Sequence, residues 1–209
     1  MSKHDIPKWT AAAATSSAAK KREINAENFD EVFREAANLY MLGVGGDKQA
    51  VKDAIDLLKK LHSHEPENHV VEAYLGSALA LIGRDAVSPI EKFKNTNNGL
   101  KMLDHAVISE PDNIEIRNLR ANVSFKLPEM YFHRTSVAIE DFLYIASRYE
   151  EDDTVFSPNL YFQTLFNIGS AFKTLGYTQD AHSAWDKLFS VTTDSAYKEL
   201  AAKEGYKKV

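Results

Sequence analysis

Two nearly identical strings, 45 residues apart, constrain the fold of this chain more than any other feature. EPEN (65–68) and EPDN (110–113) each follow a segment in which apolar residues recur at helical spacing. A small residue stands twelve positions before each proline and a leucine eight positions before it: Ala54 and Leu58 before Pro66, Gly99 and Leu103 before Pro111. The same local pattern occurs twice, which predicts a protein built from repeated helical units.

Helical periodicity continues through most of the chain after residue 25, and no sustained alternation of β-branched residues interrupts it. We therefore expect an all-α fold. Four helical hairpins can be placed at residues 25–64, 69–109, 114–150 and 159–191, and a short helix at 194–205 would cap them. One hairpin cannot bury its own apolar faces, so such arrays usually need at least three units.

The last hairpin carries the other half of the pattern. Its first helix has Leu165, Ile168, Gly169 and Phe172, and Gly176 at the turn is followed by Ala181 and Trp185. These residues resemble the tetratricopeptide repeat, in which a Leu-Gly pair and aromatic residues on the first helix precede Ala and an aromatic residue on the second. Leu75, Gly76, Leu79 and Gly83 match in the second hairpin, whereas in the third Arg120 replaces the leucine and Ser124 the aromatic residue. The resemblance implies a right-handed α-solenoid of about four irregular hairpins plus a C-terminal capping helix.

The spacing of the repeats is irregular. The period of the family is 34 residues, whereas the small residues of the second helices lie 45, 39 and 43 apart: Ala54, Gly99, Ala138 and Ala181. The largest insertion, eleven residues, precedes Gly99. Ser88-Pro89-Ile90-Glu91 is a capping-box sequence with proline at the first helical position, so we expect the inserted residues to extend the second helix by about three turns.

The extended second helix of this hairpin would be longer than the first helix against which it packs. Its apolar residues Ile90 and Phe93 would therefore need another surface to pack against. One interpretation is that both side chains cover the neighbouring hairpin's own extension around 127–132. The alternative is a lip beside the binding groove, formed by these two residues with Arg84 and Asp85, that contacts a specific partner.

Charge divides the chain into a basic start and an acidic remainder. The first 24 residues hold five basic and two acidic side chains, while the whole chain has a net charge of −5. We predict a disordered leader over 1–24, or an arm that docks on an acidic partner or on the body, and a single helical-repeat domain over 25–209. The acidic body argues against nucleic-acid binding.

The absence of cysteine excludes disulfides and thiol chemistry and fits a reducing compartment. No segment approaches 18 uninterrupted apolar residues and the leader lacks the apolar core of a signal peptide, so we expect a cytoplasmic protein with no membrane partner.

No sequence motif predicts catalysis, a cofactor or a metal. His62 and His64 in HSHEPENH are two residues apart on a helix and would point away from each other, and His105, His133 and His182 are isolated in the sequence. GVGGD (43–47) has neither a P-loop nor a dinucleotide-binding pattern and reads as a turn with Asp47 capping the next helix. We therefore expect a protein that is not an enzyme.

The resemblance to the tetratricopeptide repeat implies recognition of a protein or peptide, because in that family the first helices line a concave groove. Carried over by position, the groove would contain Phe33, Tyr40, Ala73, Ser77, Asn118, Asn122, Lys126, Phe166, Ser170 and Lys173. Asn side chains can bond a peptide main chain in both directions and Lys can take a carboxylate. The alternative function is a structural module that self-associates into a homo-oligomer through an exposed apolar strip.

Overall fold

The computed structural model describes residues 23–206, and within that range every regular element is a helix. The all-α expectation is therefore confirmed for this part of the chain, whereas the predicted leader lies almost entirely outside it. The helices are α2 (Phe29–Val44), α3 (Lys48–His64), α4 (His69–Asp85), α5 (Pro89–Ser109), α6 (Ile114–Lys126), α7 (Glu129–Phe132), α8 (Thr135–Glu151), α9 (Pro158–Thr174), α10 (Thr178–Val191) and α11 (Ser195–Lys203).

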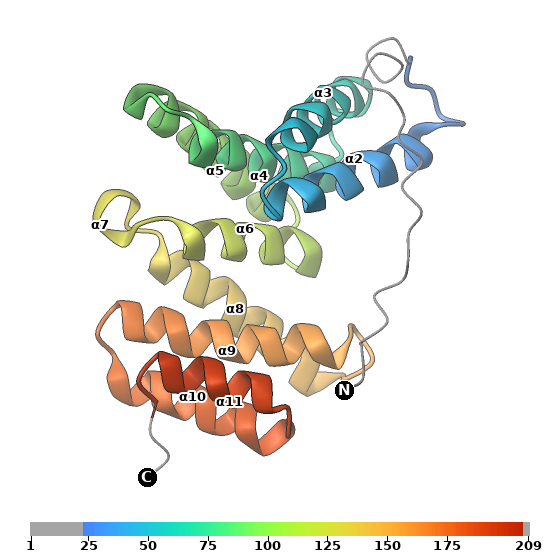
Figure 1. Cartoon of the computed structure of the whole chain (residues 1–209). Helices are drawn as coiled ribbons and strands as arrows, with labels where there is room; N and C mark the ends of the chain where they lie inside the picture. Colours follow the sequence, from blue (N-terminus) through green and yellow to red (C-terminus); the bar gives the residue numbers. More distant parts are fainter. Residues whose placement is uncertain (1–22, 207–209) are drawn as a thin grey trace, which may run out of the picture.

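The long helices pack in pairs that follow the chain. α2 packs against α3, α4 against α5, α6 against α8, and α9 against α10, and each pair contacts the next through α3 and α4, α5 and α6, and α8 and α9. Figure 1 shows the pairs following one another from the α2–α3 end to the α10–α11 end. The bounds of these pairs agree within a few residues with the four hairpins expected from the sequence.

The two repeated strings adopt the same structure. In the first, the Asn68 side chain accepts a backbone N–H of α4 at 3.1 Å and donates to Glu65 Oε2 at 3.1 Å. In the second, Asn113 accepts two backbone N–H groups of α6 at 3.1 and 3.2 Å and donates to Glu110 Oε2 at 2.8 Å. Each asparagine thus caps a first helix and ties it to the end of the preceding second helix.

The eleven inserted residues extend the second helix of the second hairpin, as expected. α5 begins at Pro89, with Ser88 at the N-cap. The Ser88 side chain makes no capping hydrogen bond, so the proline start is confirmed and the capping box is wrong. Phe93 stacks on Phe132 of α7 with ring centroids 5.3 Å apart, which confirms its predicted cover. Ile90 is 80% exposed, so the prediction that it also covers residues 127–132 is wrong.

Two apolar clusters meet at α6. The first contains residues of α2 to α6, among them Leu58, Leu103 and Leu119. The second contains residues of α6 and α8 to α11, with Phe142 and Trp185 at its centre. α6 contributes to both clusters, so it joins the two halves of the core. None of the helices in residues 23–206 combines the length and apolarity needed to cross a membrane.

The small residues of the repeat pattern stand where helices touch. A Cβ on Gly76 would lie 2.7 Å from the carbonyl oxygen of Gly99, so the backbones of α4 and α5 are in direct contact. A Cβ on Gly169 would collide with the indole of Trp185, whose Nε1–H donates to the Phe166 carbonyl at 3.2 Å. Glycine is needed at these positions because no side chain fits between the helices.

Candidate functional site

The most open group of predicted groove residues lies on α6. Asn118, Asn122 and Lys126 follow one another at four-residue steps and so share one face of the helix. The two asparagines are half-buried and the lysine is exposed. Asn122 Nδ2 donates to the main-chain oxygen and to Oδ1 of Asn118, both at 2.8 Å, which leaves its own Oδ1 free to accept a hydrogen bond.

Lys126 is held over an aromatic ring rather than in an ion pair. Its ammonium nitrogen lies 5.2 Å from the ring centroid of Phe125, at a distance where cation–π attraction still operates. Within residues 23–206 it has no carboxylate partner. The α6 face, defined as Asn118, Asn122 and Lys126, therefore offers hydrogen-bond donors and acceptors and one uncompensated positive charge.

Most of the predicted groove residues of α2 and α4 are packed inside the molecule, and Phe33 is half-buried. Phe33 and Tyr40 both meet Tyr74 edge-on, with centroids 5.3 and 5.4 Å away. Tyr40 is 7% exposed and Ser77 is completely buried, as is Ala73. Burial also raises the pKa of the Tyr40 hydroxyl. Tyr40 and Ser77 therefore have almost no surface for a ligand, which corrects the prediction that they line an accessible groove.

Two of the three predicted residues of α9 contact the C-terminal part of the chain, and the third is buried. The Phe166 ring lies 6.0 Å from Tyr197 of α11. Ser170 is buried, and Lys173 forms an ion pair with Glu204 at 2.7 Å. A ligand on α9 would have to displace these contacts, whereas one on the α6 face would not.

Arg84 and Asp85 connect the second hairpin to the first. The Arg84 guanidinium donates to the carbonyl oxygens of Gly43 (3.0 Å) and Val44 (3.4 Å) at the end of α2, and to both carboxylate oxygens of Asp85 at 2.8 and 3.0 Å. The hydrogen bonds from Arg84 hold the pKa of Asp85 below its usual value. These two residues therefore hold the end of α4, which precedes the α5 extension, against the end of α2.

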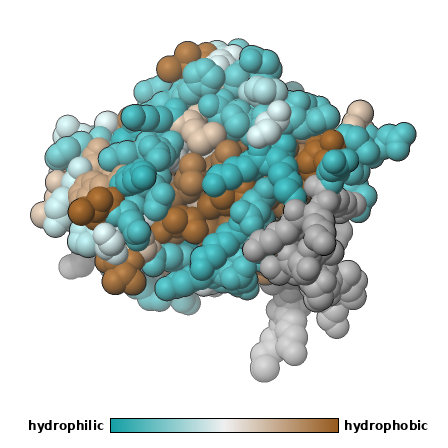
Figure 2. All heavy atoms as spheres, turned by 90° about the horizontal axis from the view of Figure 1, so that it is seen from above, coloured by the Kyte–Doolittle hydropathy of each residue, from teal (hydrophilic) through white to brown (hydrophobic). Residues whose placement is uncertain are grey.

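Exposed apolar side chains gather at the hairpin turns. The end of α2, the start of α5 and the short α7 supply a group that we call the apolar edge: Met41, Leu42, Val44, Val87, Ile90, Phe93, Met130 and Tyr131. Val87 is 94% and Ile90 80% exposed. Arg84, at the end of α4, donates a hydrogen bond to the Gly43 carbonyl oxygen at the end of α2. The ring centroids of Phe93 in α5 and Tyr131 in α7 lie 6.1 Å apart. Figure 2 shows a band of hydrophobic residues bordered by hydrophilic ones on the face seen from above.

Hydrogen bonds among five charged side chains link α5, α6 and α8. Asp141 is completely buried and receives Arg120 through two hydrogen bonds of 2.7 and 2.8 Å and Arg117 through one of 2.6 Å. Asp104 receives Arg134 at 2.6 and 3.0 Å and Arg120 at 3.4 Å. Burial acts to lower the pKa of Arg120, but the Asp141 hydrogen bonds and charge prevail and raise it. This network lies where the two apolar clusters meet.

One signal of this network is present in the sequence, although the network was not predicted from it. Arg120 stands where the repeat pattern has leucine, and a charged residue at an apolar position calls for a buried partner. The partner, Asp141, is 21 residues away and belongs to another helix, so no local spacing identifies it.

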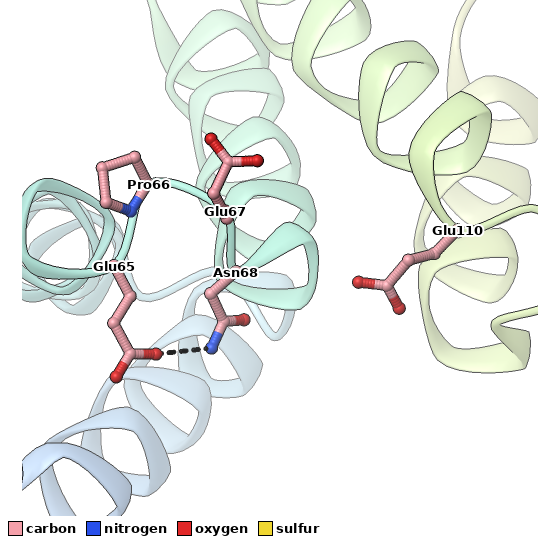
Figure 3. A pocket seen from close by; sticks show the side chains of 5 residues that line it. All are labelled: Glu65, Pro66, Glu67, Asn68 and Glu110. Carbon is pink, nitrogen blue, oxygen red and sulfur yellow. Dashed lines mark hydrogen bonds between the residues drawn. The ribbon is translucent and has the colours of Figure 1, made fainter.

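Two further features lie at the base of the second hairpin. Glu65, Pro66, Glu67, Asn68 and Glu110 line an open hollow of about 540 Å³ between the α3–α4 turn and the end of α5 (Figure 3). Its three carboxylates make the hollow acidic.

A second feature, formed by residues that do not line this hollow, is a group of two imidazoles and one carboxylate. His69 and Glu72 of α4 and His105 of α5 bring their potential ligand atoms within 4.8 Å of one another. His69 and Glu72 are three residues apart and could have been paired from the sequence, but His105 is 33 residues from Glu72.

No protein-family model matches the chain, and no curated protein shows significant similarity to it.

Proposed function

We propose that this chain is a non-catalytic protein-binding scaffold, a tetratricopeptide-like right-handed α-solenoid that holds an extended peptide or a partner helix against the first helices of its hairpins. The pairing of the helices in chain order and the close approaches at Gly76, Gly99 and Gly169 support the family assignment. The proposal includes a single helical-repeat domain over 25–209. A cytoplasmic location fits a sequence without cysteine.

The α6 face is the observation on which this function depends. Two asparagines and a lysine without a carboxylate partner stand in line on a first helix, where the family binds its ligands. A peptide main chain has alternating donors and acceptors, which Asn side chains can satisfy in both directions. Lys126 would take a carboxylate of the ligand. Because Tyr40 and Ser77 are buried, we place the ligand on the α6 half of the array.

Partner capture from the native host tests this function. The bait is the full chain, and it is compared with a variant carrying Asn118→Ala, Asn122→Ala and Lys126→Ala. A second variant, Lys94→Ala with Asn97→Ala and Asn98→Ala, removes the same residue types from the exposed side of α5. We expect the first variant to lose a partner that the second retains. If both variants retain every partner, the α6 face is not the binding site.

Self-association is the second candidate function, and the apolar edge favours it. Eight large apolar side chains at neighbouring hairpin turns are exposed in the single chain, and contiguous exposed apolar surface is typical of interfaces. Light scattering of the full chain as a function of concentration distinguishes the two functions. A dimer that Ile90→Lys converts to monomer supports self-association, and a monomer at all concentrations contradicts it.

A further inference from the structure

His69, Glu72 and His105 form a compact group that the α6 face does not involve. His69 Nδ1 lies 3.0 Å from Glu72 Oε2, and His105 Nδ1 lies 2.9 Å from both carboxylate oxygens. The two imidazole rings meet edge-on with centroids 5.5 Å apart. Two side chains from the first turn of α4 and one from α5 therefore converge on one point.

Glu72 lacks the partner that a buried carboxylate normally has. It is 7% exposed, and within residues 23–206 its polar contacts are with the two imidazoles and with no lysine or arginine. Neutral imidazoles can donate hydrogen bonds to the carboxylate but cannot balance its charge. A cation among the three side chains would do so.

We propose that His69, Glu72 and His105 bind a divalent transition-metal ion of the Zn²⁺ class, with both Nδ1 atoms and a carboxylate oxygen as ligands. Zn²⁺ takes imidazole nitrogen and carboxylate oxygen at about 2.0–2.2 Å in a tetrahedral arrangement, which sets its ligands about 3.3 Å apart. The Nδ1–Oε distances of 2.9 and 3.0 Å need to lengthen by only a few tenths of an ångström. On binding, each neutral imidazole changes from the tautomer whose Nδ1–H donates to Glu72 to the one with its hydrogen on Nε2, which frees the Nδ1 lone pair for the ion.

The donor set also decides which ions fit. Two imidazoles and one carboxylate suit Zn²⁺, Co²⁺, Ni²⁺ or Cu²⁺, whereas Mg²⁺ and Ca²⁺ prefer oxygen ligands alone. The His105 side chain is 61% exposed, which gives an ion access from solvent and leaves room for water at a fourth position. A bound ion would cross-link the first turn of α4 to α5.

Calorimetric titration of the untagged full chain with ZnCl₂, and with MgCl₂ for comparison, tests the site. We expect one Zn²⁺ per chain, a higher melting temperature in Zn²⁺, and no Mg²⁺ binding. His105→Ala should weaken Zn²⁺ binding by more than the roughly 10- to 100-fold that follows loss of an outer hydrogen bond. This variant should fold, because the side chain is mostly exposed, and circular dichroism checks that it does.

His133→Ala is the matched control, since it removes another exposed histidine, whose side chain is 76% exposed. Its Zn²⁺ affinity should equal that of the wild type. In ¹⁵N spectra the Nδ1 signals of His69 and His105 should both shift on addition of Zn²⁺. Absence of one-to-one binding, or equal affinity in His105→Ala and wild type, would show that the group is a hydrogen-bonded cluster only.

Discussion

Asp141 is a fully buried carboxylate whose charge is balanced by two arginines of the neighbouring helix. Its removal would leave Arg120 buried without its bidentate partner. Asp104 would remain 3.4 Å from Arg120 but cannot replace two short hydrogen bonds, so a buried guanidinium would be left poorly compensated, which is more costly than the loss of the ion pair itself.

We therefore predict that Asp141→Ala lowers the free energy of unfolding by about 3–5 kcal/mol, measured by urea denaturation. Glu140→Ala is the matched control: Glu140 lies 3.8 Å from Arg117 and from Arg120, but its side chain is 68% exposed, so its loss should cost no more than about 1 kcal/mol. Equal stability of the two variants would contradict the role assigned to the network.

The Arg84–Asp85 pair predicts a dependence of stability on pH. The pKa of Asp85 is lower in the folded chain than its unfolded value of about 3.9, chiefly through the Arg84 hydrogen bonds. A carboxyl with a lowered folded pKa contributes stability above the unfolded pKa and loses it as the pH falls through the folded pKa.

Asp85→Asn should therefore destabilise the protein at pH 7, by about 0.2–1 kcal/mol for a partly exposed pair, and the difference from wild type should shrink below pH 4. Denaturation curves of both proteins at the two pH values measure this. A difference that stays constant with pH would rule out the charge as its source.

At the scale of elements, the contact between α4 and α5 depends on two glycines. A Cβ at Gly99 would overlap the carbonyl oxygen of Gly76, and backbone atoms cannot move aside as a flexible side chain can. Gly99→Ala should push the helices apart and cost about 1–3 kcal/mol, although alanine is the better helix former. The neighbouring Asn98→Ala, at an exposed position, should leave the thermal midpoint unchanged; a stabilised Gly99→Ala would contradict the close contact.

The α5 extension contacts α7 through one aromatic side chain. Phe93 contacts Tyr131 and Phe132 of α7, and an aromatic pair contributes about 0.5–1.5 kcal/mol beyond the area it buries. Phe93→Ala should speed amide hydrogen exchange at the start of α5 and in α7. Ile90→Ala, which removes an exposed side chain, should leave the exchange rates unchanged. Identical exchange rates in both variants would show that the aromatic contacts of Phe93 do not stabilise this part of the chain.

Much of this element-scale structure was readable from local patterns. The repeated Glu-Pro-x-Asn strings, the proline before Ile90 and the small residues at 76, 99 and 169 each act over a few residues, so their spacing predicts helix ends and contacts. The burial of Tyr40 and Ser77 was not readable. It depends on how closely α2 and α4 pack, which a family pattern read by position does not specify.

The same limit applies to the polar groups that join distant parts of the chain. Arg120 and Asp141, or Glu72 and His105, are 21 and 33 residues apart. The first contact follows from the packing of α6 against α8 and the second from that of α4 against α5, rather than from any periodicity. These long-range pairs are also the features that distinguish this chain from a regular repeat array.

At the scale of the whole molecule, the two apolar clusters are joined through α6, which also carries the open polar face. The helix that connects the halves of the core is thus the one proposed to hold the ligand. A rigid, centrally placed helix suits this role, because its side chains lose little further freedom when a ligand binds.

The most direct test of this account is the dissociation constant of a captured partner segment for the wild type and for the two triple variants described above. We expect at least about a tenfold weaker complex for Asn118→Ala/Asn122→Ala/Lys126→Ala, equivalent to the loss of about 1.4 kcal/mol. We expect wild-type affinity for Lys94→Ala/Asn97→Ala/Asn98→Ala. Equal affinity in all three proteins would contradict the assignment of the α6 face as the binding site.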